Sequence, residues 1–345
     1  MSVKKEVFGE VNGETVYIVT LANSSGMVVE VLSYGAILRS VIVPDKDGKF
    51  EDVCLSIKDA ETMAKGGGGY NGMVVGRYAN RVGNAQYVIN GKTYNLELSQ
   101  RGPYALHSGS ASYGRRNFTV ADIDEKSNQV TMTLKDNGEG GFESKLDFSV
   151  TYAVAEDENS LSLTYNAICD DDTIVSFTNH CYLNLAGQAS GETILDHIFT
   201  VNANNYTPSV DALPIGTIDP VEGTEFDWRE PQRLGDMLEK HNMVFYDHNF
   251  AIDGSGFRLC GTAYDPKSGR FMETFCDLPG MHFFTTAGRD EPVEGKNGAM
   301  YGKYPGFCHE TQNYPDAPNR PNFPSPIIKA NVPYETKTVF RFSTK

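Results

Sequence analysis

The sequence predicts an all-β protein, a large twisted sandwich of antiparallel sheets with few short helices. Three observations lead to this fold class. Apolar residues alternate with polar ones over several runs, which is the pattern of strands that bury one face. Turn dipeptides of the Asn-Gly and Asp-Gly type separate such runs. Segments with the period of an α-helix are scarce and short.

The clearest alternation lies in the middle of the chain and at its carboxyl end. The runs are 129–134, 145–154, 160–165 and 337–342. The turn signals are Asn12-Gly13, Asp47-Gly48, Asn90-Gly91, Asn137-Gly138 and Asp253-Gly254. Two segments, 58–65 and 231–240, are the candidate helices. No linker, charge block or internal repeat divides the chain, so we expect one domain over residues 1–345.

The composition favours a soluble protein with an uncharged or cationic ligand. Thirty basic residues and 45 acidic ones give the 345-residue chain a formal net charge of −15. A surface this acidic repels phosphate groups, so we expect no binding to nucleic acid or to a membrane. We expect neither a membrane-spanning segment nor a secretory signal. Six cysteines without CxxC spacing indicate a reduced, cytoplasmic protein rather than a zinc site or a disulfide framework.

The first candidate for a functional site is the segment 179–185, where polar groups occupy positions of a strand pattern. Alternation places His180, Tyr182 and Asn184 on one face and Cys181 on the opposite, core-facing side. Imidazole, phenol and amide together fit the lining of a pocket. A hydrogen-bonded structural histidine explains His180 equally well.

The segment 307–314 is the second candidate. Alternation points Glu310 to one face and His309 to the other, so the two cannot both serve one small site in a regular strand. Taken alone, Glu310 fits a solvated or ion-paired carboxylate better than a catalyst. The proline-rich stretch that follows cannot be a central strand, and we expect a rigid surface connection that could form the wall of a cleft.

Two further places carry polar clusters. Arg77 and Arg81 lie four residues apart among glycines and could clamp a hydroxylated or anionic ligand, or be paired surface charges. Asp247, His248 and His107 could bind a metal, but no second histidine follows at helical spacing, so no metal site is predicted. The sequence also lacks a nucleophile elbow, a dinucleotide fingerprint and a P-loop in the context that each requires.

Together these segments resemble the aldose 1-epimerase (galactose mutarotase) family. The resemblance rests on the segments 76–83, 106–107, 178–187, 246–250 and 306–316, with support from 33–45 and 196–208. The motifs occur in the order of the family from near residue 30 to the carboxyl end. The Thr-Asn-His and Glu-Thr-Gln-Asn-Tyr-Pro-Asp segments are highly specific, so the chain is identified as a member of this family.

The resemblance implies a β-supersandwich fold and an isomerase that interconverts the α and β anomers of free hexoses such as galactose and glucose. It implies that Glu310 is the general base and His180 the general acid. The implied substrate-binding residues are Asn80, Arg81, His107, Tyr182, Asp247 and His282. His282 stands where the family usually has glutamine, and Ser108 stands where glycine is usual. No cofactor or metal is required.

The chemistry explains why these residue types are needed. Opening a cyclic hemiacetal requires one group that takes the proton of the anomeric hydroxyl and another that gives a proton to the ring oxygen. A carboxylate and an imidazolium suit these two tasks, so two distant segments must meet around the sugar. We expect the negative charges of Glu310 and Asp247 to raise the pKa of His180 and keep it protonated.

Several alternatives stay open. A hexose-6-phosphate 1-epimerase would need a basic phosphate pocket, for which Arg77 and the segment 115–116 are candidates. A non-catalytic sugar-binding module of the same fold would bind a sugar without exchanging its anomers. A glycosidase could use Glu310 and Asp247 as its two carboxylates. The preferred aldose and the choice between a monomer and a weak homodimer are not decided. So acidic a chain could also hold an adventitious or structural Ca²⁺ ion, whose ligands no spacing predicts.

Overall fold

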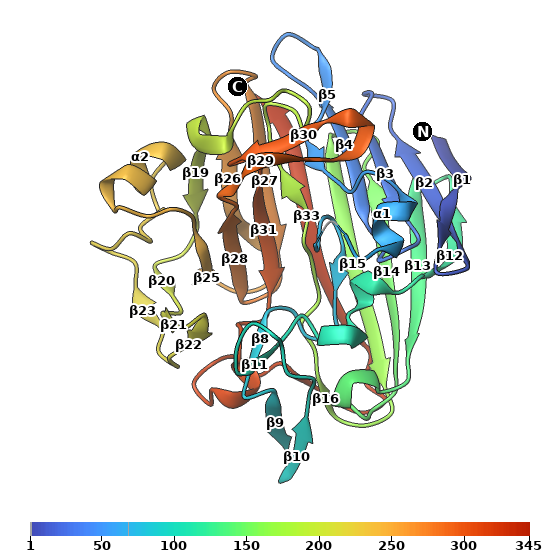
Figure 1. Cartoon of the computed structure of the whole chain (residues 1–345), viewed down its shortest axis with the longest axis vertical. Helices are drawn as coiled ribbons and strands as arrows, with labels where there is room; N and C mark the ends of the chain where they lie inside the picture. Colours follow the sequence, from blue (N-terminus) through green and yellow to red (C-terminus); the bar gives the residue numbers. More distant parts are fainter. Residues whose placement is uncertain (1, 68) are drawn as a thin grey trace.

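The computed structural model describes residues 2–67 and 69–345, and strands make up most of its regular structure (Figure 1). The α-helices of the described residues are two, α1 (Ala60–Ala64) and α2 (Leu234–Lys240). Both lie inside the segments in which the sequence predicts helices. The first begins after Asp59, whose carboxylate accepts a hydrogen bond from the backbone N–H of Thr62 (2.8 Å). The all-β prediction is confirmed.

The largest sheet, here the large sheet, has the strand order β12-β13-β14-β15-β33-β27-β26-β19-β24. Its strands are β12 (Thr119–Asp124), β13 (Gln129–Asp136), β14 (Leu146–Val154), β15 (Ser160–Cys169), β33 (Tyr334–Thr344), β27 (Arg270–Cys276), β26 (Arg258–Tyr264), β19 (Ile198–Val201) and β24 (Gln232–Arg233). All neighbours are antiparallel. The buried residues of β13 and β14 follow the predicted alternation.

A second antiparallel sheet carries most of the candidate residues and is called the site sheet. Its order is β23-β20-β25-β28-β31-β18-β6. Its strands are β23 (Asp219–Pro220), β20 (Asn205–Tyr206), β25 (Asp247–Ala251), β28 (Gly280–Thr285), β31 (Phe307–Gln312), β18 (Tyr182–Leu183) and β6 (Cys54–Leu55). One face packs on the large sheet, because the ring of Phe199 lies 5.0 Å from Phe283 and 4.9 Å from Phe307 between centroids. The other face carries most of the candidate residues.

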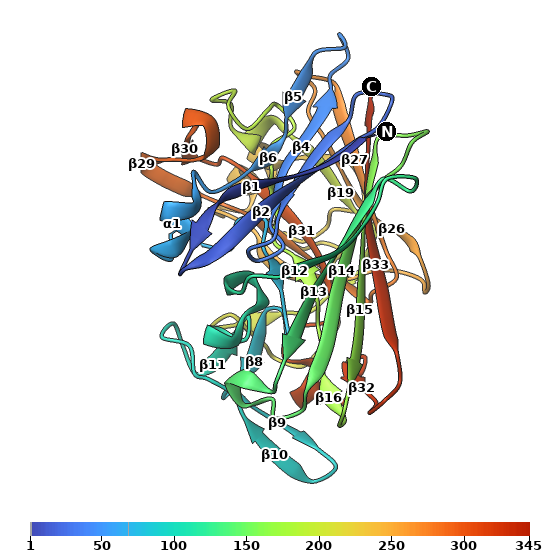
Figure 2. The same ribbon diagram turned by 90° about the vertical axis from the view of Figure 1, so that its right-hand side faces the viewer.

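The N-terminal sheet packs on another part of the large sheet. Its strands, in order, are β1 (Ser2–Val11), β2 (Glu14–Ala22), β3 (Val28–Leu32), β4 (Leu38–Pro44) and β5 (Phe50–Asp52). The Tyr152 hydroxyl on β14 donates to the carbonyl of Ala36 next to β4 (2.5 Å). In Figure 2, β1 and β2 run obliquely to β14 and β15. One buried apolar cluster holds side chains from all three sheets.

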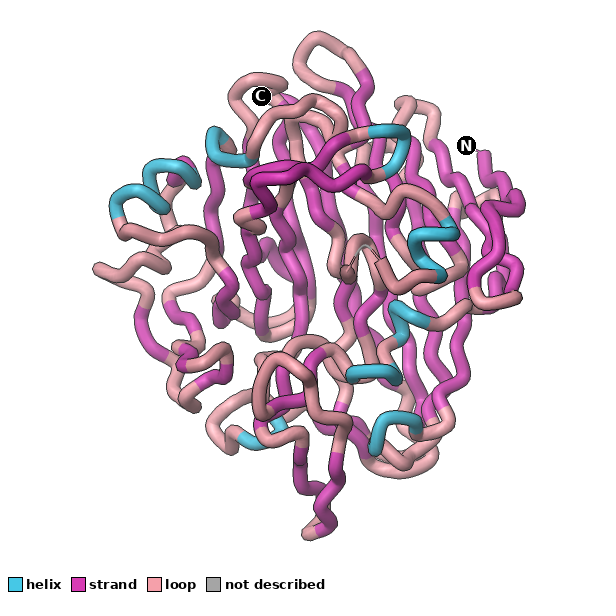
Figure 3. The backbone as a smooth tube through the Cα atoms, in the orientation of Figure 1, coloured by secondary structure: helices cyan, strands magenta, loops and turns pink. Residues whose placement is uncertain are grey.

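Short strand pairs complete the structure around these sheets. They are β7 (Val74–Val75) with β17 (Thr178–Asn179), β8 (Arg81–Gly83) with β11 (Tyr104–Leu106), β9 (Gln86–Ile89) with β10 (Lys92–Asn95), β16 (Thr173–Ile174) with β32 (Ile327–Ile328), β21 (Ser209–Val210) with β22 (Leu213–Pro214), and β29 (Gly288–Glu294) with β30 (Met300–Lys303). Figure 3 shows the short helical segments around the sheets. Over the described residues, no helix combines the length and the apolar character that crossing a bilayer requires.

Candidate active site

The two catalytic candidates, which come from distant parts of the chain, meet in one place. His180 lies between β17 and β18, Glu310 lies on β31, and Nε2 of His180 is 3.5 Å from Oε1 of Glu310. Their side chains are only 9% and 2% exposed. The predicted separation of Glu310 from His309 is confirmed. His309 points to the core side, where its Nδ1 lies 2.9 Å from the hydroxyl of Thr274.

Strand pairing brings two more candidates beside Glu310. His282 on β28 is paired with Glu310 on β31, and Asn249 on β25 is paired with His282. Paired residues point to the same face of a sheet, so these side chains share the face of Glu310. Asp247 lies two residues before Asn249 on β25 and therefore points to that face as well.

Four of the predicted substrate-binding residues form a closed polar ring. Nε2 of His282 is 2.6 Å from Oδ1 of Asp247, and its Nδ1 is 3.4 Å from Nδ2 of Asn80. Arg81 donates from Nη1 to Oδ1 of Asn80 (3.0 Å), and its Nη2 lies 3.6 Å from Oδ2 of Asp247. Oδ1 of Asn80 accepts from Arg81, so the amide nitrogen of Asn80 faces Nδ1 of His282, while Nε2 of His282 faces the carboxylate of Asp247. His282 thus links Asn80 to Asp247 through its two ring nitrogens.

The charge of Asp247 is held in place by this ring. Burial acts to raise the pKa of Asp247, but the hydrogen bond from His282 and the charges of His282 and Arg81 hold the pKa well below its usual range. The carboxylate is therefore ionised at neutral pH and can accept hydrogen bonds from hydroxyl groups.

The protonation of His180 differs from the expectation. Burial, together with a smaller effect of the nearby charge of His282, lowers the pKa of His180 to about 4. Burial also raises the pKa of Glu310 well above its usual range, and the charge of Asp247 acts in the same direction. The expectation that carboxylates keep His180 protonated is wrong, because burying an imidazolium is more unfavourable than those charges are favourable. At neutral pH the imidazole of His180 is therefore uncharged, and burial favours the protonated form of Glu310.

Aromatic rings surround His180. Tyr182 stacks on it with ring centroids 5.0 Å apart, and Tyr70 stacks on it at 5.8 Å. His107 lies 5.6 Å from His180 and 4.5 Å from Tyr70, and its Nδ1 accepts a hydrogen bond from the backbone N–H of Asn80 (3.0 Å). Sequence reasoning misses Tyr70, because it follows the glycine run 66–69, of which residue 68 is outside the described residues, and no periodicity marks it.

The two arginines of the segment 76–83 have different environments. Arg81 reaches the pocket beside Asp247. Arg77 is fully buried, and it donates from Nε to Asp136 (2.9 Å) and from Nη1 to the hydroxyl of Ser144 (2.7 Å). The prediction of a two-arginine clamp or of paired surface charges is therefore wrong for Arg77, because its guanidinium is bound inside the protein.

Asn184 does not join the pocket. Its amide nitrogen donates to the carbonyls of Glu192 (2.9 Å) and Pro305 (3.1 Å). The prediction that it shares a face with His180 and Tyr182 is wrong, because the backbone does not continue as one strand through this segment. Cys181 is buried in the core, as predicted.

The connection after β31 is buried at first and exposed later. Residues 313–317 are buried, whereas most of 318–325 is not. The prediction of a surface connection is wrong for the first part. There the Tyr78 hydroxyl donates to the carbonyl of Tyr314 (2.9 Å), and the Tyr314 ring packs edge-on against Phe323 with centroids 5.3 Å apart.

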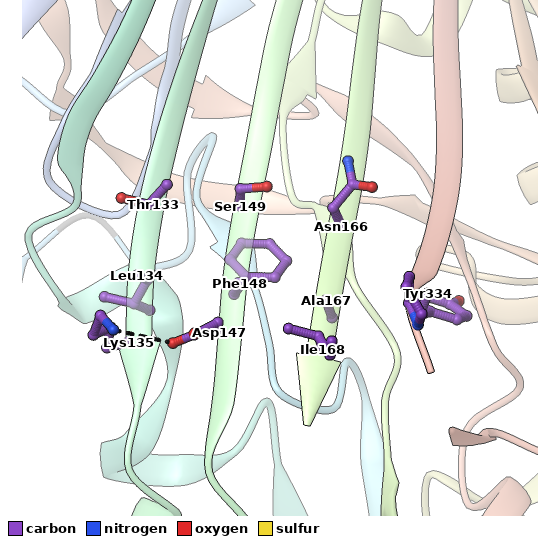
Figure 4. Close-up of a pocket in the computed structure, with 11 residues that line it drawn as sticks. Thr133, Leu134, Lys135, Asp147, Phe148, Ser149, Asn166, Ala167, Ile168 and Tyr334 are labelled. Carbon is purple, nitrogen blue, oxygen red and sulfur yellow. Dashed lines mark ion pairs between the residues drawn. The ribbon is translucent and has the colours of Figure 1, made fainter. Parts of the chain in front are cut away.

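A separate hollow of about 460 Å³ lies over β13, β14, β15 and β33 (Figure 4). Phe148, Ile168 and Tyr334 are among its lining residues. Its charged side chains are Lys135 and Asp147, which lie 3.6 Å apart. None of the predicted site residues lines this hollow. It offers no pair of groups suited to exchange protons with a sugar.

Comparisons with known proteins agree with this geometry. A family model described as Aldose 1-epimerase matches residues 17–341. The chain is 37% identical to the galactose mutarotase of Homo sapiens over 347 residues, which cover 99% of each chain. It is 31% identical to the aldose 1-epimerase of Haemophilus influenzae over 349 residues, which cover 98% of this chain and 99% of that protein.

Solved structures show the same fold. An aldose epimerase homologue from C. elegans superposes with a TM-score of 0.86 at 26% identity, over 95% of this chain and 98% of the other. A galactose 1-epimerase from Lactobacillus acidophilus superposes with a TM-score of 0.85 at 24% identity, over 99% of each chain. The architecture is thus that of the galactose mutarotase-like sandwich proteins. The chain belongs to the aldose 1-epimerase family.

Proposed function

We propose that this protein is an isomerase that interconverts the α and β anomers of free aldohexoses such as galactose and glucose. The observation that carries this proposal is the approach of one carboxyl group and one imidazole to 3.5 Å, from Glu310 and His180, beside a ring of polar side chains. Relatives over the full length are named galactose mutarotase and aldose 1-epimerase, which supports an aldose substrate.

The proposed reaction moves two protons and breaks one bond. The carboxylate of Glu310 takes the proton of the C1 hydroxyl, the bond between C1 and the ring oxygen breaks, and the imidazolium of His180 protonates the ring oxygen. The product is the open-chain aldehyde, with Glu310 protonated and His180 neutral. Rotation about the C1–C2 bond presents the other face of the aldehyde to the C5 hydroxyl. The reverse proton transfers then close the ring.

The pKa shifts fit this cycle. A protonated Glu310 beside a neutral His180 is the state of the pair after ring opening. The state needed to open the ring holds the same number of protons, with one proton moved from the carboxyl to the imidazole. Oε2 of Glu310 is buried and has no hydrogen-bond partner among the described residues. We propose that a sugar hydroxyl donates to this oxygen and stabilises the carboxylate, since hydrogen bonds favour the charged form.

The polar ring is the proposed binding site for the remaining hydroxyls. Asp247 is an ionised acceptor and Arg81 is a donor, so together they can bind a hydroxyl in both of its roles. The residues that we propose to bind the sugar are Asn80, Arg81, His107, Tyr182, Asp247 and His282. The proposed acid–base chemistry needs no cofactor.

A free sugar is favoured over a sugar phosphate. The phosphate alternative depended in part on Arg77, but its guanidinium is bound to Asp136 in the interior. Arg116 lies 3.5 Å from Glu139, and Arg115 lies over the ring of Tyr70 at 5.9 Å. These contacts give no cluster of cations facing a common point.

We also propose a cytoplasmic protein that acts as one domain, as a monomer or weak homodimer. The six cysteines are buried thiols, which suits a reducing compartment. The compartment and the oligomeric state are independent of the proposed chemistry.

The test is a polarimetric assay of freshly dissolved α-anomers. We expect the protein to accelerate the rotation change of galactose and glucose, and to act far more weakly on the 6-phosphates of these hexoses. Acceleration of the phosphates alone would show that the substrate is assigned wrongly. Binding of galactose in calorimetry without any acceleration would show a sugar-binding module, and release of reducing sugar from a glycoside would show a glycosidase.

A further inference from the structure

The pocket holds a third potential metal ligand that the acid–base reaction does not use. Cys308 lies on β31 two residues before Glu310 and so points to the same face. Its Sγ is 3.5 Å from Nδ1 of His180, whose Nε2 is 3.5 Å from Oε1 of Glu310. Among the described residues, these three form the one group of three or more His, Cys, Asp or Glu side chains whose ligand atoms all lie within 4.8 Å of one another.

The spacing fits a small ion that prefers sulfur and nitrogen. Zinc binds thiolate at about 2.3 Å and imidazole nitrogen at about 2.0–2.1 Å, and tetrahedral angles then separate sulfur and nitrogen by about 3.5 Å. The observed separation of Sγ of Cys308 and Nδ1 of His180 is 3.5 Å. One ligand atom from each of Cys308, His180 and Glu310 lies within 4.8 Å of the other two, so the three side chains surround one point.

Burial and charge favour a divalent ion at this point. Cys308 and Glu310 are almost fully buried, and Oε2 of Glu310 has no hydrogen-bond partner among the described residues. A buried polar atom without a partner is unfavourable unless a ligand supplies one. When a divalent ion binds through a thiolate, a carboxylate and a neutral imidazole, the thiol and the carboxyl each release a proton to solvent. The complex then has no net charge, which suits a buried site.

We propose that Cys308, His180 and Glu310 form a binding site for a soft divalent transition-metal ion such as Zn²⁺, and that the bound ion inhibits the sugar reaction. The ion occupies the lone pair of His180 and the carboxylate of Glu310, which are the groups that exchange protons with the sugar. Ion and sugar therefore exclude each other. Ca²⁺ and Mg²⁺ prefer oxygen ligands and are excluded by the thiol. The inhibition rests on the proposed function, whereas the binding of the metal ion does not.

The test for binding is a titration of the full-length, metal-free protein with Co²⁺. A Co²⁺–thiolate bond gives a charge-transfer absorption in the near ultraviolet, which reports a cysteine ligand directly. We expect one ion per chain, displacement by Zn²⁺, and no response to Mg²⁺. The variant Cys308→Ser should lose the absorption and bind at least about tenfold more weakly. The matched control is Cys169→Ser on β15, whose thiol contacts the carbonyl of Lys329; it should behave like the unmodified protein.

Two results of the Co²⁺ titration would contradict a metal site at Cys308. Co²⁺ binding without the absorption, or with equal affinity in Cys308→Ser, would place the ion elsewhere and overturn the site. If the Cys308→Ser variant does not fold, the Cys308→Ala variant removes the same thiol ligand and replaces it in the titration.

The inhibition is tested separately in the anomer assay. Zn²⁺ should slow galactose exchange, with relief by excess galactose, and should slow Cys308→Ser much less relative to its own metal-free rate. If Zn²⁺ binds through Cys308 and leaves the exchange rate unchanged, the inhibitory role is wrong. A protein that binds Zn²⁺ in this way but exchanges no sugar at all would refute the proposed function and leave the metal site intact.

Discussion

The ionisable side chains of the site differ in their protonation, and the difference depends on whether each has a close hydrogen-bonded partner of opposite charge. Asp247 keeps its charge because His282 lies 2.6 Å away and Arg81 lies nearby. His180 and Glu310 are both buried, but their contact of 3.5 Å is longer, and burial lowers the pKa of the imidazole to about 4. Between them the two groups can pass one proton without leaving an isolated charge in the interior.

Alanine substitutions of Arg77 and Arg81 compare an arginine that stabilises the fold with one that we propose binds the sugar. Arg77→Ala leaves the carboxylate of Asp136 buried without its partner, and we expect a loss of about 3–5 kcal/mol in the free energy of unfolding. Arg81→Ala removes a partly exposed pocket residue, and we expect a stability change within about 1 kcal/mol. Its main effect should be a higher KM for galactose, with a smaller change in kcat. Urea unfolding and polarimetric kinetics measure the two effects.

Two results would contradict the roles given to Arg77 and Arg81. Equal losses of stability in the two variants would show that Arg77 is not the structural member of the pair. An unchanged KM in Arg81→Ala would show that this guanidinium does not bind the sugar.

At the level of elements, the sequence predicts well wherever a strand is continuous. The alternation of 145–154 and 160–165 matches the burial of β14 and β15. Along β31 the same rule separates Glu310 from His309 correctly, although every residue of that strand is buried. Period-two patterns depend on local geometry alone, so they hold where the pairing of the strand is uninterrupted.

The period-two alternation fails where the chain changes the strand with which it pairs. Thr178–Asn179 pairs with β7, whereas Tyr182–Leu183 pairs with β31 and β6 in the site sheet. Between them the backbone N–H of His180 donates to Met73 (2.9 Å) and its carbonyl accepts from Gly72 (2.9 Å). This transition puts the imidazole into the pocket and takes Asn184 out of it. No single-sequence pattern encodes the change of partner.

The candidate site is predicted only in part for the same reason. The family motifs name His180, Glu310 and the residues of the polar ring, but they do not show that the ring is closed by hydrogen bonds. The contacts of Tyr70 and Cys308 with His180 are tertiary and carry no periodic signal. The protonation of the pair depends on burial, which the sequence does not provide.

At the scale of the whole molecule, burial acts on most of the histidines. In the described residues, five of the seven have a lowered pKa, and burial is the largest cause for each; they are His107, His180, His197, His248 and His309. The pKa of His197 falls to about 4 and that of His309 to about 3. The packing of the sheets therefore depends on keeping these side chains neutral.

We expect acid to destabilise the fold between about pH 6.5 and pH 4.5. In this range the unfolded chain protonates these five histidines while the folded chain does not, so the free energy of unfolding falls as the pH falls. Each buried histidine contributes up to about 1.4 kcal/mol per pH unit. The raised pKa of Glu310 opposes this trend. Urea unfolding at a series of pH values measures the slope.

A matched variant isolates one contribution to this slope. His309→Gln should reduce the slope by about one proton, or about 1.4 kcal/mol per pH unit, whatever its effect on absolute stability. Stability that stays constant or rises on acidification to about pH 4.5 would contradict the account of buried neutral histidines.

The most direct measurement of the central claim is the rate of galactose anomer exchange in Glu310→Gln, His180→Asn and the double variant, followed by polarimetry or NMR exchange spectroscopy. Circular dichroism confirms that each variant is folded. We predict that each single substitution slows exchange by about 10²–10⁴-fold. The double variant should be little slower than the worse single one, because the two groups act on one sugar as a unit. A single variant near the wild-type rate, or effects that multiply in the double variant, would contradict proton exchange by this pair.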